Sequence, residues 1–548
     1  MNIFGFLISL IFIVDGLNLW GGKEVVYYLI LFLPFLLYLY GYIKKKKLFS
    51  PKKLIYLWAG FSLFSLISVI FSLDLHVSFE QFLLYQSLFL ITVYFWNDKE
   101  NLSKLIEFVI NYLSLFFILA FIFKDQILKL NIISSNDNVN LFFPVIGGHN
   151  HLGDFLGLAI ISSFIKKKYY LIIFFAVFFI ISFSRSSYLA LFIAFSALIF
   201  LKKIPINFKQ GSILISLILI VFFAFTFSTR EFRPNNFPFK KILMNFNLGQ
   251  KIFTGHRDKF FLSALLGFKD KPFFGYGMGN YIQISKKYAS LFGGIKSDIS
   301  HNLFLDILSG NGIFAFIFFM AFICLILKKG EKNLNFYLII YLLINFSFDY
   351  TYTSNSLLLL FFLLLASIYK DNSILNVKKL YSLGLIIIFL PAIFMIISQI
   401  FFNKKNYRSS ISFYPLKKEA YRELINSEVN NNKKLTEQYL KMYQQRFPSN
   451  LDQLYISAQT YEIMKDYKSS LVYYKKLYDE GYGFNRKNVL KIYVLYKNLK
   501  NSKMAYSAVK DFITKVKKEK KYFLMTYQAR LLCLEIYGYP GKDNICKF

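Results

Sequence analysis

Three polar segments in this otherwise apolar chain hold side chains of the kind that chemistry at a membrane needs. The first, residues 182–188, places Arg185 among serines between two apolar runs. An arginine at a membrane boundary is unfavourable unless it is paired or functional, and its planar guanidinium is well suited to a phosphate. The alternative is an interfacial arginine that only extends its charge toward lipid head groups. The segment is therefore a candidate phosphate-binding element.

The second segment, residues 255–281, contains Arg257 and a glycine-rich run. Residues 258–268 are expected to form an amphipathic helix lying on the membrane, with Arg257 at its start. Glycine permits backbone conformations and a close ligand approach that other residues do not. The run lacks the strand context of a nucleotide-binding fingerprint, so it is a candidate substrate-binding turn of another kind. Its candidate binding residues are Gly275, Gly277, Gly279 and Asn280.

The third segment, Ser300-His301-Asn302, stands where a long loop returns to an apolar run. A histidine titrates near neutral pH and is the natural general base for an alcohol nucleophile. The alternative for a single histidine at such a place is a structural role. We therefore treat His301 as a candidate base and Asn302 as a candidate substrate-binding neighbour.

The elements that must position these segments are membrane helices. The chain of 548 residues is 56% hydrophobic, and apolar runs of the length needed to cross a bilayer recur along it. Segments exposed to lipid must satisfy their own backbone hydrogen bonds, which favours helices, and the alternating pattern of a membrane barrel is absent. The expected fold is all-α, a polytopic membrane protein of about 12–13 transmembrane helices. The expected spans are 3–20, 25–43, 54–73, 81–97, 105–123, 149–165, 169–183, 186–201, 212–228, 303–327, 334–350, 354–369 and 380–402.

The distribution of lysines predicts the sidedness of these spans. The short loops on one side hold roughly 20 Lys and Arg residues against about 4 on the other, so the first side is expected to be cytoplasmic. The histidines, the loop of about residues 229–302 and the C-terminal domain then lie outside. The formal net charge of +34 invites a nucleic-acid interpretation, but no nucleic-acid motif accompanies it. Clusters at helix ends indicate membrane lipids as the partner instead.

The pattern changes in the last part of the chain. We expect a membrane domain over residues 1–402 and a soluble helical domain over residues 403–548. The latter has the spacing of tetratricopeptide repeats, because Tyr461 and Ser470 recur near the expected period of 34 residues as Tyr496 and Ala505. Stacked helical hairpins of this type form a concave surface for an extended partner. An unrelated helical bundle is the alternative.

The three polar segments together resemble the O-antigen ligase and polymerase superfamily, which includes bacterial protein O-oligosaccharyltransferases. The resemblance rests on Arg185 after the seventh helix, Arg257 at the start of the loop helix, the Pro-x-x-Gly-x-Gly-x-Gly-Asn run over residues 272–280, and His301-Asn302 before the next helix. It covers roughly residues 1–370. Ser186 departs from the glycine that many ligases have at this place, and the thirteenth span and the repeat domain exceed the usual plan of twelve helices.

The resemblance implies an inverting, metal-independent and cofactor-free transfer of a glycan from a polyprenyl diphosphate carrier. Arg185 and Arg257 would hold the diphosphate, and His301 would deprotonate the acceptor hydroxyl. Asn150 falls where relatives often carry an asparagine at a helix start, and is a possible acceptor-site residue. The implied place is a bacterial inner (plasma) membrane, with the active site and the C-terminal domain extracytoplasmic.

Several alternatives stay open. The acceptor is a lipid, another lipid-linked glycan or a protein, and the repeat domain slightly favours a polymer. A transporter or flippase for lipid-linked saccharide is a different class, although transporters place polar groups near the bilayer midplane in repeated helices. A membrane-anchored scaffold is a third class. The cysteines, Cys324, Cys533 and Cys546, lack metal-ligand spacing, and free thiols are expected for the last two unless an external domain pairs them.

Overall fold

The computed structural model describes most of the chain. The described residues are 3–16, 23–44, 48–123, 149–182, 184–201, 256–292, 295–370, 374–448, 450–480, 485–518 and 523–537. The expected span 212–228, the first part of the expected outer loop and Cys546 lie outside them.

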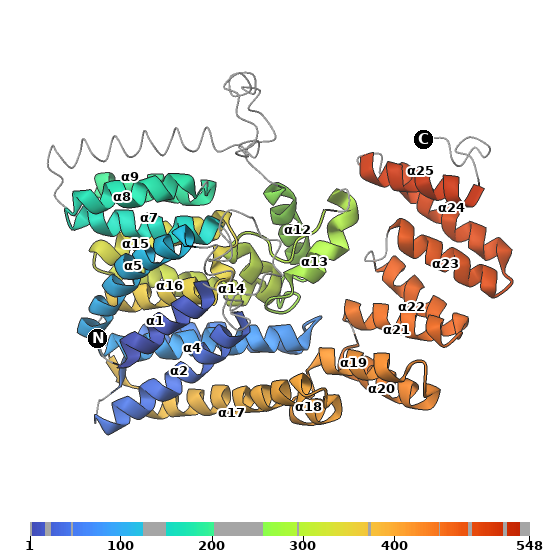
Figure 1. Ribbon diagram of the computed structural model, residues 1–548, viewed down its shortest axis with the longest axis horizontal. Coiled ribbons are helices and arrows are strands. Elements are labelled where there is room, and N and C mark those ends of the chain that lie inside the picture. Colours follow the sequence, from blue (N-terminus) through green and yellow to red (C-terminus); the bar gives the residue numbers. More distant parts are fainter. Residues whose placement is uncertain are drawn as a thin grey trace, which may run out of the picture.

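Twelve apolar helices among the described residues correspond to twelve of the thirteen expected spans, and they run side by side in one bundle (Figure 1). Five of them are long and apolar enough to cross a membrane on length and composition alone. The prediction of an all-α, multi-pass membrane protein is confirmed. The helices are α1 (Ile3–Gly16), α2 (Lys23–Ile43), α3 (Lys52–Ile70), α4 (Leu75–Trp96), α5 (Lys99–Ile122), α7 (His149–Ile165), α8 (Tyr169–Ile181), α9 (Arg185–Leu201), α14 (Leu303–Lys329), α15 (Leu334–Phe348), α16 (Asn355–Ile368) and α17 (Lys378–Asn403).

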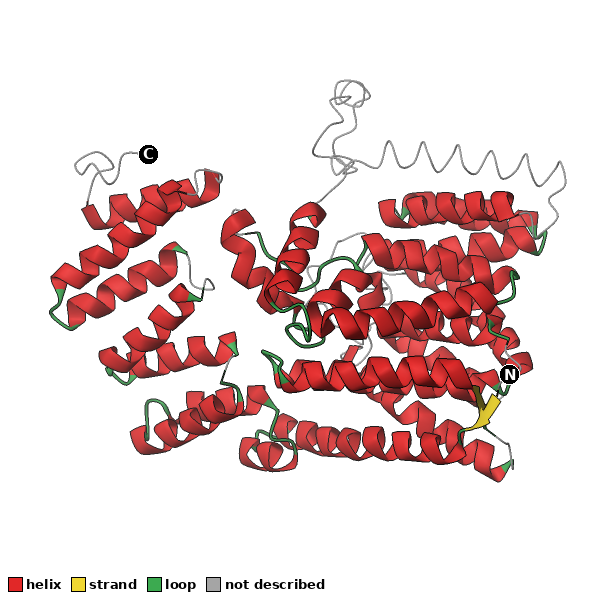
Figure 2. Ribbon diagram, turned by 180° about the vertical axis from the view of Figure 1, so that it is seen from behind, coloured by secondary structure: helices red, strands yellow, loops and turns green. Residues whose placement is uncertain are grey.

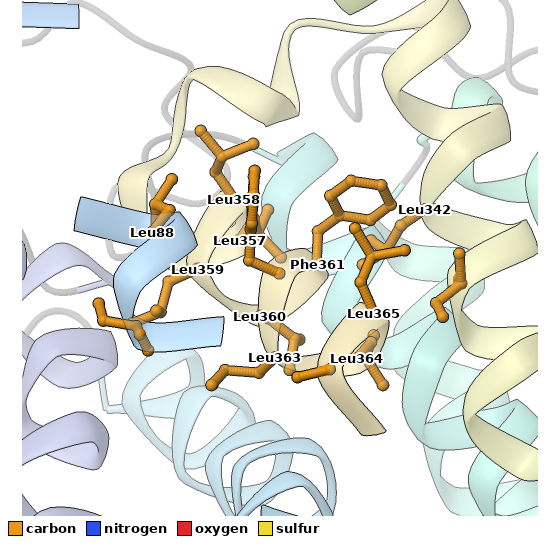
Figure 3. Close-up of a cluster of buried hydrophobic side chains, with 14 of the residues drawn as sticks. Leu88, Leu342, Leu357, Leu358, Leu359, Leu360, Phe361, Leu363, Leu364 and Leu365 are labelled. Carbon is orange, nitrogen blue, oxygen red and sulfur yellow. The ribbon is translucent and has the colours of Figure 1, made fainter. Parts of the chain in front are cut away.

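Helix α16 lies at the centre of the bundle. Its leucines from Leu357 to Leu365 are buried on every side of the helix, and they pack against Leu88 of α4 and Leu342 of α15 (Figure 3). A helix that is hydrophobic all round needs neighbours all round, which explains why this 14-residue helix reaches no lipid-facing position. The outer helices, such as α17, instead expose leucines and isoleucines on one side.

Helix α4 begins six residues earlier than the expected span because Asp74 caps it. The Asp74 carboxylate accepts a hydrogen bond from the backbone N–H of Val77, which satisfies one of the free donors of the first turn. His76 and Glu80 therefore lie in the first turns of α4 and not in a loop. Both side chains contact each other, with 3.5 Å between His76 Nε2 and Glu80 Oε1.

The two ends of the bundle differ in composition. At one end a short antiparallel pair of strands, β1 (Phe49–Pro51) and β2 (Ile374–Asn376), joins the loops after α2 and α16 (Figure 2). Lysines cluster there, among them Lys370, which pairs with Glu331, and Lys99, which bonds the carbonyl of Tyr369. The three polar segments gather at the opposite end. This arrangement agrees with the alternation of lysine-rich and lysine-poor loops in the sequence.

At that opposite end, the glycine-rich run closes a break in α14. Gly312 has a φ of +78°, and the loop backbone fills the break: Ile313 N–H donates to Pro272 O (2.8 Å), and Gly277 N–H donates to Gly310 O (2.8 Å). A Cβ at Gly312 would lie 2.1 Å from Phe273 O, and one at Gly275 would lie 2.2 Å from Gly310 O. Both positions need glycine because two backbones meet there.

Two short helices, α12 (Arg257–Asp270) and α13 (Tyr281–Tyr288), flank this run at the same end of the bundle. The amphipathic helix expected over residues 258–268 is α12. A further set of helices follows α17 and stands beyond the bundle on the side of α12 and α13 (Figure 1). They are α18 (Tyr407–Phe413), α19 (Lys418–Glu428), α20 (Lys433–Arg446), α21 (Leu451–Ile463), α22 (Tyr467–Asp479), α23 (Arg486–Asn498), α24 (Ser502–Lys518) and α25 (Phe523–Tyr537).

These helices form consecutive hairpins. In the pair α21 and α22, Leu454, Ala458 and Tyr474 are buried together, as the repeat spacing requires, and α23 begins 35 residues after α21. The identification of the hairpins as tetratricopeptide repeats stays a prediction, as does the division of the chain at residues 402 and 403. Cys324 is a free, exposed thiol, whereas Cys533 is disulfide-bonded, so the free thiol expected at Cys533 is not found. Cys546 lies outside the described residues.

A buried ionic contact joins these C-terminal helices to the bundle. Lys418 Nζ of α19 lies 2.6 Å from Asp74 Oδ2, and Asn450 Nδ2 donates to the same oxygen at 2.9 Å. The Asp74 side chain is only 1% exposed. Burial alone would raise the pKa of Asp74, but the ammonium of Lys418 outweighs it and holds the pKa below its ordinary value.

We expect Asp74→Asn to loosen this docking. The neutral side chain still caps α4 but no longer attracts Lys418, so amide hydrogen exchange over residues 406–420 should rise about tenfold or more, corresponding to a loss of about 1.4 kcal/mol or more. Glu462→Gln, which removes an ion pair with Lys491 within the C-terminal helices, is the matched control and should leave that exchange unchanged.

The docking should also depend on pH in one direction. A carboxyl whose pKa is lower in the folded state contributes stability above its unfolded pKa of about 3.9 and loses it as the pH falls further. Protection of these amides, taken relative to the intrinsic exchange rate at each pH, should therefore persist at pH 5 and fall only below about pH 4. A loss of protection between pH 7 and pH 5 would contradict the role of Asp74.

Candidate active site at one end of the bundle

The centre of the site is an ion pair between a sequence-predicted arginine and a buried carboxylate. Arg257 opens α12, and its guanidinium donates to Asp349 Oδ2 at 3.1 Å. Asp349 follows the last residue of α15 and is fully buried, whereas a quarter of the Arg257 side chain is exposed. The guanidinium can therefore hold Asp349 with one nitrogen and still present others to a ligand outside.

His301 lies near the other oxygen of the same carboxylate. Its Nδ1 is 3.9 Å from Asp349 Oδ1. The imidazole stacks on Phe260 of α12 with 5.3 Å between ring centres and meets the edge of Tyr350 at 5.4 Å. Arg257 and Phe260 are three residues apart and so share one face of α12. The ring of His301 is thus oriented by three neighbours and keeps 18% of its side chain exposed.

The backbone of His301 also adopts an uncommon conformation. Its φ is +62°, in the left-handed region that favours glycine and is uncommon for histidine. The residues on either side hold the turn: Ser300 Oγ donates to Asn302 O (2.8 Å), and Asn302 Oδ1 caps α14 by accepting from Leu305 N–H (2.9 Å). These hydrogen bonds fix the backbone turn and thereby the position of the His301 imidazole.

The electrostatics of Asp349 favour its ionised form. Burial would raise the pKa of this carboxyl, but the charge of Arg257, the nearby imidazole of His301 and the hydrogen bond from Ser186 outweigh it and hold the pKa far below its ordinary value. The backbone N–H of Tyr350 also donates to Asp349 Oδ1 at 2.7 Å. Asp349 is therefore a fixed negative charge between two groups that carry or acquire positive charge.

Arg185 is linked to Asp349 through the next residue, Ser186. Arg185 is the first residue of α9, and the hydroxyl of Ser186 donates to Asp349 Oδ2 in a short hydrogen bond. The four serines around Arg185 are buried, whereas Arg185 itself is half-buried at the end of the bundle. Ser186, a departure from the glycine of many ligases, thus has a defined contact in this chain.

Tyr350 joins the start of α7 to the site. Its ring meets His151 with 5.4 Å between ring centres and His301 at the same distance from another side. Asn150, the possible acceptor-site residue, interacts with the Tyr350 side chain. Five residues therefore contact the dipeptide Asp349-Tyr350. They are Asn150, His151, Ser186, Arg257 and His301.

The predicted substrate-binding residues of the loop lie differently. Gly275 and Gly277 pack against the break in α14, and Gly279 packs against Gln81 and Val77 of α4. Asn280 is 1% exposed and donates to Ser78 Oγ at 2.7 Å, and Asn302 donates to Ser347 O at 2.8 Å. These contacts give the residues a structural role, and their predicted contact with substrate is not tested by them.

Asp349 and Tyr350 are the residues that sequence reasoning missed. Both were assigned to the end of the expected span 334–350. A signal was present, because an aspartate between two apolar runs on the lysine-poor side is unfavourable unless it is paired. What the sequence lacked was the partner: Arg257 is 92 residues away from Asp349 along the chain.

Comparison with known protein families identifies part of the chain. Residues 170–320 match the model of the O-antigen ligase family. This region is similar to O-antigen ligases, which supports the resemblance to that superfamily. The match includes Arg185, Arg257, the glycine-rich run and His301, whereas Asn150 and Asp349 lie outside it. No curated protein and no protein of solved structure matches the chain.

The match to the O-antigen ligase family supports a glycosyl-transfer function in the membrane at the level of the family. Within the described ranges, no group of three or more His, Cys, Asp and Glu side chains is arranged to hold a metal ion. The groups around Asp349 that bear on the chemistry are the guanidinium groups of Arg185 and Arg257 and the imidazole of His301.

Proposed function

We propose that this protein transfers a glycan from a polyprenyl diphosphate carrier to an acceptor hydroxyl at the outer face of the membrane. The observation that carries the proposal is the shared carboxylate: Asp349 contacts Arg257 (3.1 Å), His301 (3.9 Å) and the neighbour of Arg185. A glycosyl diphosphate already has a good leaving group. The protein must therefore supply positive charge for the diphosphate and a base for the acceptor, and this site offers both.

In the proposed reaction, His301 takes the proton of the acceptor hydroxyl as its oxygen attacks the anomeric carbon. The bond between that carbon and the phosphate oxygen breaks, and its electron pair leaves with the diphosphate. Attack from the face opposite the leaving group inverts the configuration at the anomeric carbon. Arg185 and Arg257 neutralise the charge on the diphosphate, and Asp349 stabilises the imidazolium that forms on His301.

The acceptor is proposed from the same geometry. Tyr350 lies between His301 and the first residues of α7, Asn150 and His151, so we propose that an acceptor hydroxyl that reaches His301 passes these side chains. The C-terminal helices stand on the same side of the bundle, which favours a polymeric glycan or a protein as acceptor over a compact lipid (Figure 1). The proposed location is a bacterial plasma membrane with this end extracytoplasmic, in keeping with the lysine-rich loops at the other end.

The test uses the purified protein in liposomes that contain a polyprenyl-diphosphate oligosaccharide and candidate acceptors, with products sized on a gel. We expect transfer with the diphosphate donor and at least about 100-fold less with a matched monophosphate donor, which has a poorer leaving group and only half of the charge that two arginines would bind. A ladder indicates polymerisation, and a single shifted band indicates ligation.

The competing class predicts a different result. A transporter or flippase would move the labelled donor between leaflets without forming a new glycosidic bond. Leaflet exchange without product, for every acceptor tried, would contradict the proposed enzyme activity. Product that forms equally well from the monophosphate donor would contradict the proposed roles of Arg185 and Arg257.

A further inference from the structure

A second carboxylate lies in the helix bundle behind the site. Asp154 of α7 is fully buried, four residues after Asn150. Its Oδ1 accepts from Ser187 Oγ of α9 at 2.7 Å and from Asn345 Nδ2 of α15 at 2.5 Å. It therefore connects three helices whose ends supply the site: α7 with Asn150, α9 with Arg185, and α15 with Asp349.

A chain of hydroxyl groups leads from Asp154 back to the site. Ser187 Oγ lies 2.6 Å from Ser184 Oγ, which is 3.3 Å from Ser186 Oγ, and Ser186 bonds Asp349. All three serines are buried. Asp154 and Asp349 thus accept hydrogen bonds at the two ends of a chain of serine hydroxyls. These serines precede and follow Arg185 in the sequence.

The backbones are also held closely at this place. A Cβ on Gly153, next to Asp154, would lie 2.7 Å from Ser184 Cβ and 2.8 Å from Ser187 Oγ. Tyr341 of α15 donates to the carbonyl oxygen of Gly153 at 3.2 Å. The segment before α9 therefore has little room to shift relative to α7 while these contacts persist.

A buried carboxyl group needs hydrogen bonds, and here one of the two donors to its Oδ1, Ser187, belongs to the segment that presents Arg185. We propose that Asp154 is a positioning residue: through Ser187 and Ser184 it fixes the start of α9 and thereby the direction in which Arg185 meets a diphosphate. This inference rests on the proposed function. Asp154 is fully buried, so the proposed effect on the donor passes through Arg185 and not through direct contact.

The proposal predicts different effects for two substitutions. Asp154→Ala removes the acceptor, and we expect the KM for the diphosphate donor to rise about tenfold or more with a smaller change in kcat. Asp154→Asn keeps an oxygen for Ser187 and Asn345, and the KM should stay within about threefold of wild type. Ser114→Ala is the control, because Ser114 of α5 bonds the carbonyl of Phe155 on α7 without contacting α9.

A double substitution distinguishes positioning from general packing. Arg185→Lys keeps a cation but not the planar fork, so the direction of the side chain matters less. If Asp154 acts through Arg185, Asp154→Ala should change the donor KM less than about threefold in the Arg185→Lys background. Equal effects in both backgrounds would overturn the proposal, as would an Asp154→Asn variant as impaired as Asp154→Ala.

Binding of polyprenyl diphosphate alone, measured with the same variants, keeps this result separate from the proposed function. If wild type binds the diphosphate and Asp154→Ala weakens binding only when Arg185 is present, the positioning role stands even where no transfer product forms. Unchanged binding in the Asp154→Ala variant would overturn it even where wild type transfers glycan.

Discussion

Replacement of His301 by asparagine should lower the rate of glycan transfer by about 10²–10⁴-fold, the range that a positioned general base contributes. Asparagine is the informative substitution because it tolerates the left-handed backbone conformation that His301 adopts, with its φ of +62°. The turn and the cap of α14 should therefore persist. The amide cannot accept a proton at neutral pH, so the loss reports the missing base rather than a shifted loop.

The measurement is the initial rate of product formation in liposomes at saturating donor and acceptor. His76→Asn is the matched control, since His76 is also near the lysine-poor end of the bundle but bonds Tyr414 at 3.1 Å and not Asp349. Donor binding should change little in His301→Asn, because Arg185 and Arg257 are unaltered. A variant that keeps more than about a tenth of the wild-type rate would show that another group takes the proton.

The sequence was sufficient for the parts of the fold that depend on local patterns. Apolar runs of the right length predicted twelve of the helices described, since a helix in lipid is determined by its own hydrophobicity. The helix after Arg257 followed from its amphipathic spacing. The start of α4 was missed because a cap, Asp74, extends the helix through polar residues that hydropathy assigns to a loop.

The candidate site was only half predictable for a related reason. Arg185, Arg257 and His301 have side chains whose chemistry and place in the chain are visible one at a time. The role of Asp349 depends on its contacts with residues 186, 257 and 301. Those contacts form only when α9, α12 and α14 pack against α15. Conversely, the glycines at 275 and 277 suggested a ligand, whereas their closest neighbours are backbone atoms of α14 and side chains near α4.

Because Asp349 contacts both Arg257 and His301, Asp349→Asn should lower kcat/KM by about 10²-fold or more. Removal of one partner from a buried ion pair costs about 3–5 kcal/mol, and each 1.36 kcal/mol of transition-state stabilisation is a factor of ten in rate. The loss should fall short of the full amount, because a quarter of the Arg257 side chain is exposed and water can solvate it. Glu331→Gln, which breaks an ion pair with Lys370 at the other end of the bundle, should change kcat/KM less than about twofold.

The pH dependence separates the charge of Asp349 from its shape. Because the pKa of this carboxyl in the folded protein lies far below its ordinary value, Asp349 stays ionised throughout the range from pH 5 to 8. In the His301→Asn background, which has no titrating imidazole at this place, the affinity for the diphosphate donor with and without Asp349→Asn should therefore differ by the same factor at every pH from 5 to 8. A difference that shrinks toward pH 5 would mean that Asp349 takes up a proton in this range. The carboxylate would then act as an acid–base group, and the imidazole of His301 would no longer be the only proton acceptor that the mechanism needs.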